Sequence, residues 1–151
     1  MNTKLVFPSI AGAILLIMGL FFLANPSYKI SIEAKYHYEV GEYKEAYKLA
    51  QEAFSLDLYN RMASTIMAQS KISLQYVAYM EMANKYMKSI NEIATHEVIS
   101  NADKAKIRTI CEIMIGSYTK LAPSVITDKE LVEKVASYHT KFESLFEKVN
   151  K

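Results

Sequence analysis

Apolar residues form one uninterrupted run near the N-terminus and recur at helical spacing through the rest of the chain. Residues 5–24 contain no charged side chain, and twelve of them are Leu, Ile, Phe or Val. At about 1.5 Å of rise per residue, this run makes roughly 30 Å of helix, the thickness of the hydrocarbon core of a bilayer. Those twelve side chains favour insertion by roughly 4–7 kcal/mol. The pattern predicts a transmembrane helix over Leu5–Ala24.

The residues around Ala24 favour a retained signal-anchor over a cleaved signal peptide, which is the alternative. A cleavage site needs small residues at positions −3 and −1, whereas a cut after Ala24 places Phe22 at −3. Lys4 precedes the run, and the lysines after it are diluted by acidic residues. The positive-inside rule then places the N-terminus in the cytoplasm. We therefore expect a single-pass protein of a bacterial inner membrane, with a stub and anchor over 1–25 and a periplasmic domain over 26–151.

The domain after the anchor shows the periodicity of amphipathic helices and no sustained alternation of strand type, which predicts an all-α fold of five to six helices. Pro26 suits a first helical turn. Helices are expected over 28–40 and over 42–58, because Gly41 breaks the pattern between them.

The segment from Gly41 to Asp57 resembles the second helix of a tetratricopeptide repeat. A glycine is followed two residues later by an aromatic and then by alanines at helical spacing, ending in Leu-Asp. Leu58 stands where a proline usually closes the repeat, and Ile30 stands where an aromatic is frequent. The resemblance covers one 34-residue unit, residues 27–60, and implies a stack of helical hairpins.

Small side chains give this resemblance a physical sense. Ala34, Ala46 and Ala53 would let two antiparallel helices approach closely, and Tyr43 would fill the space beside the turn. A degenerate second repeat is expected over 61–94. There Ala68 takes the small-residue position, Gln75 replaces the turn glycine, and Met80 and Met87 replace alanines. Because a single repeat cannot bury its own faces, this second hairpin is expected to stack on the first.

Two further helices are expected to close the domain. The first covers 101–122, capped by Asn101 or Asp103 and ended by Pro123. The second covers 127–150, where Thr127 to Glu130 have the spacing of a capping box. Its apolar residues alternate four and three apart: Leu131, Val135, Tyr138, Phe142, Leu145 and Val149. This 131–149 stripe is either the last layer of the stack, which we favour, or a coiled-coil seam of a homo-oligomer.

Net charge and the placement of reactive side chains exclude several classes of function. The net charge is +2, and basic residues alternate with acidic ones, which argues against a nucleic-acid binder. His37, His96 and His139 lie apart without metal-ligand spacing, and Cys111 sits on an apolar stripe. No glycine-rich phosphate loop is present. The sequence thus predicts a protein without a metal site, without a bound cofactor and without enzymatic activity.

The resemblance implies instead a concave groove lined by the first helices of successive repeats. Carried over by position, its partner-binding residues are Tyr28, Ser31, Lys35, Tyr38, Glu39, Met62, Thr65, Gln69 and Ile72. Eleven tyrosines suit such a surface, because tyrosine offers area and a hydroxyl at low entropic cost. The alternative is that the tyrosines fill the outer core of a thin helical domain.

The function predicted from these features is a membrane-anchored scaffold or adaptor that binds other proteins of a bacterial envelope complex. The length of the chain, its predicted anchor and its one well-matched repeat are similar to those of accessory proteins of large envelope machines, such as the ones around polar flagellar motors. The alternative is a membrane-tethered periplasmic chaperone that binds client proteins in the same groove.

Overall fold

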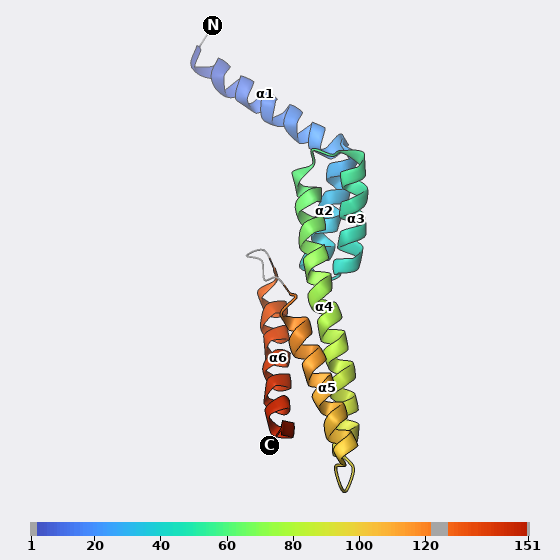
Figure 1. Ribbon diagram of the computed structural model, residues 1–151. Helices are drawn as coiled ribbons and strands as arrows, with labels where there is room; N and C mark the ends of the chain where they lie inside the picture. Colours follow the sequence, from blue (N-terminus) through green and yellow to red (C-terminus); the bar gives the residue numbers. More distant parts are fainter. Residues whose placement is uncertain (1–2, 122–126, 151) are drawn as a thin grey trace. The chain divides into compact units, whose positions relative to one another are not determined.

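The computed structural model describes residues 3–121 and 127–150, with the side chains of residues 3–6 and 21–23 left out. Its described residues form six helices and no strand, which confirms the all-α prediction (Figure 1). The helices are α1 (Thr3–Ala24), α2 (Pro26–Glu39), α3 (Tyr43–Leu56), α4 (Arg61–Ala94), α5 (Asn101–Tyr118) and α6 (Lys129–Asn150). They form two compact units, Met1–Lys71 and Ile72–Lys151, and α4 contributes residues to both.

The first correction concerns α1. No helix in the described part of the chain is both long enough and apolar enough to cross a membrane. This finding corrects the predicted transmembrane signal-anchor over Leu5–Ala24, and with it the predicted single-pass location in a bacterial inner membrane.

The α2–α3 hairpin forms as its end signals predict. Asn25 accepts a hydrogen bond from the backbone N–H of Ser27 at 3.0 Å and caps α2, whose first residue is proline. At the other end, Gly41 has a φ of 84°, in the left-handed region that favours glycine. The N–H of Glu42 then donates to the His37 carbonyl at 2.8 Å. Together with the bond from Gly41 N–H to the Tyr38 carbonyl, this closes α2 in a Schellman motif.

The predicted second hairpin over 61–94 does not form. Helix α4 runs without interruption from Arg61 to Ala94, through the expected turn at Gln75. The reason is that this stretch contains neither glycine nor proline, so nothing in it opposes helix propagation. Ala68, expected in a close helix contact, is exposed because the second helix that would have covered it is part of α4 itself.

The second unit contains residues 72–94 of α4 together with α5 and α6, and the cap of α5 corrects one prediction. Ser100, rather than Asn101 or Asp103, is the N-cap of α5, and Asp103 is its partner in a capping box. At the start of α6, the Asp128 carboxylate accepts the N–H of Glu130 at 2.9 Å, and the predicted cap at Thr127 stays a prediction. Helix α5 ends at Tyr118, and the predicted end at Ala122 and Pro123 lies outside the described residues.

The heptad stripe of α6 packs within this unit. Leu131, Val135 and Phe142 are buried, and the Tyr138 hydroxyl donates to the Asn84 side chain of α4. This packing favours the last-layer interpretation of the stripe. The homo-oligomeric seam over 131–149 stays a prediction.

Candidate partner-binding groove

A buried polar network holds the first unit together at the start of α4. Asn60 is fully buried, and its side-chain amide donates to the hydroxyls of Ser27 and Ser31 at 2.8 Å each. The two hydroxyls donate in turn to the carbonyls of Ala53 and Ser27. The Asn60 side-chain oxygen accepts the backbone N–H of Ala63 at 3.1 Å, as an N-cap does. Every polar atom of the Asn60 side chain is therefore paired, and α2, α3 and α4 are fixed to one another.

Small residues bring these helices close together. Ala34, Ala46, Ala50 and Ala53 are fully buried, and Ile66 of α4 packs against the same core. The predicted burial of the repeat-type alanines is therefore confirmed. Tyr43 is also buried, and its ring meets that of Tyr38 edge to face at 5.4 Å between centroids, beside the turn.

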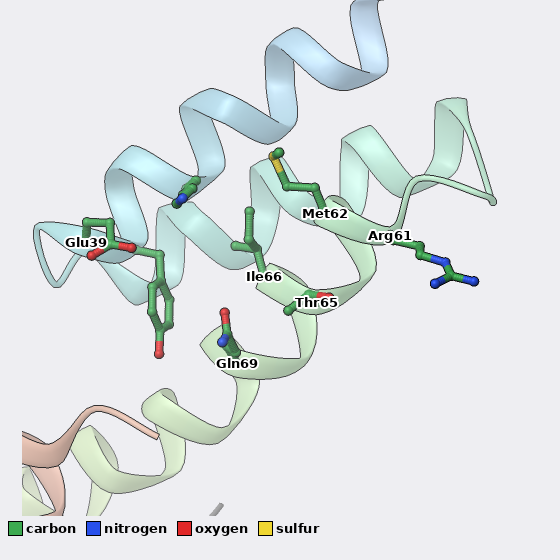
Figure 2. Close-up of a pocket in the computed structure, with 8 residues that line it drawn as sticks. Glu39, Arg61, Met62, Thr65, Ile66 and Gln69 are labelled. Atoms are coloured by element: carbon green, nitrogen blue, oxygen red, sulfur yellow. The ribbon is translucent and has the colours of Figure 1, made fainter. Parts of the chain in front are cut away.

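A groove of about 440 Å³ runs between α2 and the first turns of α4, and we call it the α2–α4 groove (Figure 2). It is lined by Lys35, Tyr38, Glu39, Arg61, Met62, Thr65, Ile66 and Gln69. Six of these eight are among the nine residues that the repeat resemblance selected. The structure thus brings together two sets of residues that lie about 25 positions apart in the chain.

Three of the nine selected residues do not line the groove. Ser31 is buried in the Asn60 network, because its position on α2 faces α4 instead of solvent. Tyr28 is half-buried outside the groove, and Ile72 belongs to the second unit. Two lining residues were missed, Arg61 and Ile66. The signal for Ile66 was available, since it lies one helical turn after Met62 on the same face. As partner-binding residues, all nine remain predictions.

The groove combines an apolar floor with a charged rim. Ile66 is only 4 % exposed and points from α4 toward the other helices, while Met62 is 37 % exposed (Figure 2). Lys35, Glu39 and Arg61 form no ion pair with any described residue. Glu39 and Arg61 lie toward opposite ends of the groove in Figure 2. A ligand in the groove would therefore meet hydrophobic contacts along the floor and charges of opposite sign at the two ends.

The histidines have local roles elsewhere. Each holds a ring nitrogen within 3.4 Å of a neighbouring carboxylate. The pairs are His37 with Glu42, His96 with Asp103, and His139 with Glu143. Hydrogen bonds from Ser100 lower the pKa of Asp103, with a smaller contribution from His96. In the described residues, no three His, Cys, Asp or Glu side chains are placed to hold a metal ion.

The tyrosines divide between core and surface. Tyr76 and Tyr79 are buried in the second unit, whereas Tyr36 is 64 % exposed and Tyr38 lines the groove. Burial raises the pKa of Tyr79 to about 12, with smaller contributions from Tyr118 and Glu143. The core interpretation is therefore confirmed for Tyr76 and Tyr79, and the partner-binding interpretation stays a prediction.

Comparisons of the chain with protein-family models, with curated proteins and with solved structures find no match. The likeness to a tetratricopeptide repeat thus rests on residues 27–60 alone.

Proposed function

We propose that this chain is a protein-interaction adaptor, without catalytic activity of its own, that binds a segment of another protein in the α2–α4 groove. The observation that carries the proposal is the groove itself. It joins an apolar floor of Met62 and Ile66 to three rim charges that have no partner among the described residues. Apolar anchoring within a polar rim is the usual anatomy of a protein interface.

The support around the groove suits this role. The Asn60 network and the alanine core hold α2 and α4 in a fixed geometry. The groove therefore loses little conformational entropy when a ligand binds. A groove of about 440 Å³ accommodates a few side chains of a peptide, not a whole domain. The partner would therefore present a short segment.

The test is capture of partners by the full chain, followed by identification of the co-purifying proteins. The groove variant combines Lys35→Ser with Met62→Ser, because both side chains lie on the groove and reach solvent. Tyr38 is left intact, since it also packs against the alanine core. We expect the groove variant to capture its partner about tenfold less well, as loss of one interface anchor does.

The control is Tyr36→Ser, which removes an exposed aromatic of α2 that does not line the groove. It should leave capture unchanged. Equal capture by wild type and groove variant would overturn the proposal. One stoichiometric partner would indicate an adaptor, whereas many substoichiometric clients, with suppression of aggregation, would favour the chaperone alternative.

A further inference from the structure

The connection between α3 and α4 presents apolar side chains to solvent on a fixed backbone. Tyr59 is 92 % exposed, and Leu56 and Leu58 are 55 % and 68 % exposed. The Asp57 side chain accepts the backbone N–H of Tyr59 at 2.9 Å, and the Asp57 carbonyl accepts that of Asn60. We call residues 57–59 the α3–α4 loop, and Leu56, the last residue of α3, adjoins it.

This loop is ordered before it meets any ligand. The residue that follows it, Asn60, is fully buried and paired with Ser27 and Ser31, which ties the loop to the body of the first unit. A rigid aromatic side chain is an efficient binding anchor, because little conformational entropy is lost when it is immobilised. Tyr59, exposed on a fixed backbone, is therefore suited to anchor a binding partner.

The loop and the α2–α4 groove complement each other in chemistry. The loop carries apolar side chains around one carboxylate, Asp57. The groove offers an apolar floor and three rim charges without an ion-pair partner among the described residues, namely the cations Lys35 and Arg61 and the carboxylate of Glu39. Placing the loop in the groove would cover Tyr59 and Leu58 and bring the Asp57 carboxylate to Arg61, toward the end of the groove opposite Glu39 (Figure 2).

The two surfaces are also contiguous on one unit. A second hollow of about 310 Å³ lies beside the loop, lined by Leu58, Tyr59, Asn60, Arg61, Ser64 and Thr65. Arg61 and Thr65 line this hollow and the α2–α4 groove alike. Complementary patches that adjoin on one face are what a two-fold axis requires, because each copy then gives its loop and receives its partner's loop at once.

We propose that two copies of this chain pair through this face, with the α3–α4 loop of each copy seated in the α2–α4 groove of the other. The inference rests on the proposed function, since it assigns the groove its occupant in the unbound protein. A dimer of this kind covers the groove, so a partner protein must displace the loop in order to bind.

The test measures self-association of the full chain by sedimentation over a range of concentrations. The loop variant is Tyr59→Ser, and the groove variant is Lys35→Ser with Met62→Ser. Each should weaken dimerisation by about tenfold or more. An equal mixture of the two variants should dimerise better than either alone, because a mixed pair retains one intact loop facing one intact groove. Tyr36→Ser should dimerise like the wild type, and circular dichroism checks that every variant is folded.

Cross-linking gives an independent measurement of the same contact. Chains carrying Tyr59→Cys, mixed with chains carrying Gln69→Cys, should form a disulfide between copies under mild oxidation. The native Cys111 is buried and serves as the background. In the partner-capture experiment, Tyr59→Ser should increase capture because its grooves are left open.

The outcomes separate the two proposals. A protein that stays monomeric, a dimer unaffected by Tyr59→Ser, or a mixture that dimerises no better than its components would overturn the loop-in-groove dimer. If the groove variant still loses partner capture, the adaptor function stands and only the occupant is wrong. A groove variant that changes neither capture nor dimerisation contradicts both proposals.

Discussion

The cores of the two units consist of different types of residue. In the first unit, alanines at no measurable exposure bring the helices together, and a buried asparagine with two serines links their ends. In the second unit, large side chains such as Phe142, Met114 and Tyr79 fill the interior. One core depends on close backbone approach and the hydrogen bonds of Asn60, whereas the other depends on side-chain volume.

Polar pairing also differs between them. Every polar atom of the Asn60 side chain has a partner in the first unit, although the Ser70 hydroxyl near its end has none among the described residues. In the second unit, the Tyr79 hydroxyl and the Nδ1 of His139 are buried without a described partner. A buried polar atom without a partner contributes desolvation cost and no bond. The first unit should therefore respond most to loss of a hydrogen bond, and the second to loss of volume.

The largest effect is expected from Phe142→Ala, which removes a fully buried ring from the second core. The free energy of unfolding should fall by about 3–5 kcal/mol, as for other buried Phe→Ala changes. Amide hydrogen exchange should show lost protection in α5 and α6, with α2 and α3 unaffected. Phe7→Ala is the control, because Phe7 is 84 % exposed and its truncation leaves no cavity. Equal loss of protection in α2 and α3 would show that the two cores unfold as one.

A smaller effect in the first unit is expected from Asn60→Ala. The variant loses the cap of α4 and both donors to Ser27 and Ser31, and unfolding should become about 2–3 kcal/mol easier. Asn60→Ser separates the two losses, since a serine retains a capping oxygen but not the two amide donors. It should fall between Asn60→Ala and wild type in chemical denaturation.

The control for this prediction is Asn91→Ala, at an exposed position inside α4, which should change stability little. If Asn60→Ser matches the wild type, the hydrogen bonds to the serines add nothing beyond the cap. The contrast between a polar and an apolar core would then be lost.

The difference between the units also explains what the sequence could predict. The first hairpin was predictable because its determinants are local: proline starts α2, Gly41 adopts a positive φ, and the alanines face inward. Six of eight groove residues followed from the same repeat spacing. Asn60 was not singled out, since its partners lie 29 and 33 positions away and only tertiary structure brings them to it.

The failures have an equally physical origin. The repeat pattern suggested a turn at Gln75, but a period alone does not end a helix when no glycine or proline interrupts it. Ser31 was assigned to the groove by position, although a small hydroxyl on that face can be buried once Asn60 supplies a donor. The sequence pattern placed the cap of α5 at Asn101 or Asp103 instead of Ser100. The reason is that a sequence pattern locates a helix end only to within one or two residues.

The smallest effect on stability at neutral pH is expected from Tyr79→Phe, and it gives the sharpest comparison of polar pairing. The Tyr79 hydroxyl is buried without a described partner, so its removal should leave the free energy of unfolding unchanged or raise it by up to about 1 kcal/mol. Tyr138→Phe is the matched control, because it removes a hydroxyl that donates to Asn84 and should lower stability by about 1 kcal/mol. A clear loss of stability in Tyr79→Phe would show that its hydroxyl is paired after all.

The same variant should also remove part of the alkaline loss of stability. Burial raises the pKa of Tyr79 from 10.0 to about 12, so between these two values the unfolded chain has released the phenolic proton and the folded chain still holds it. The folded state therefore binds more protons, and the free energy of unfolding falls as pH rises through this range. Below the unfolded pKa, both states are protonated and the contribution vanishes. Denaturant titrations at a series of pH values should show a shallower decline above pH 10 in Tyr79→Phe than in wild type. Parallel declines would mean that the phenol ionises equally readily in both states and that the second core is open to water at this position.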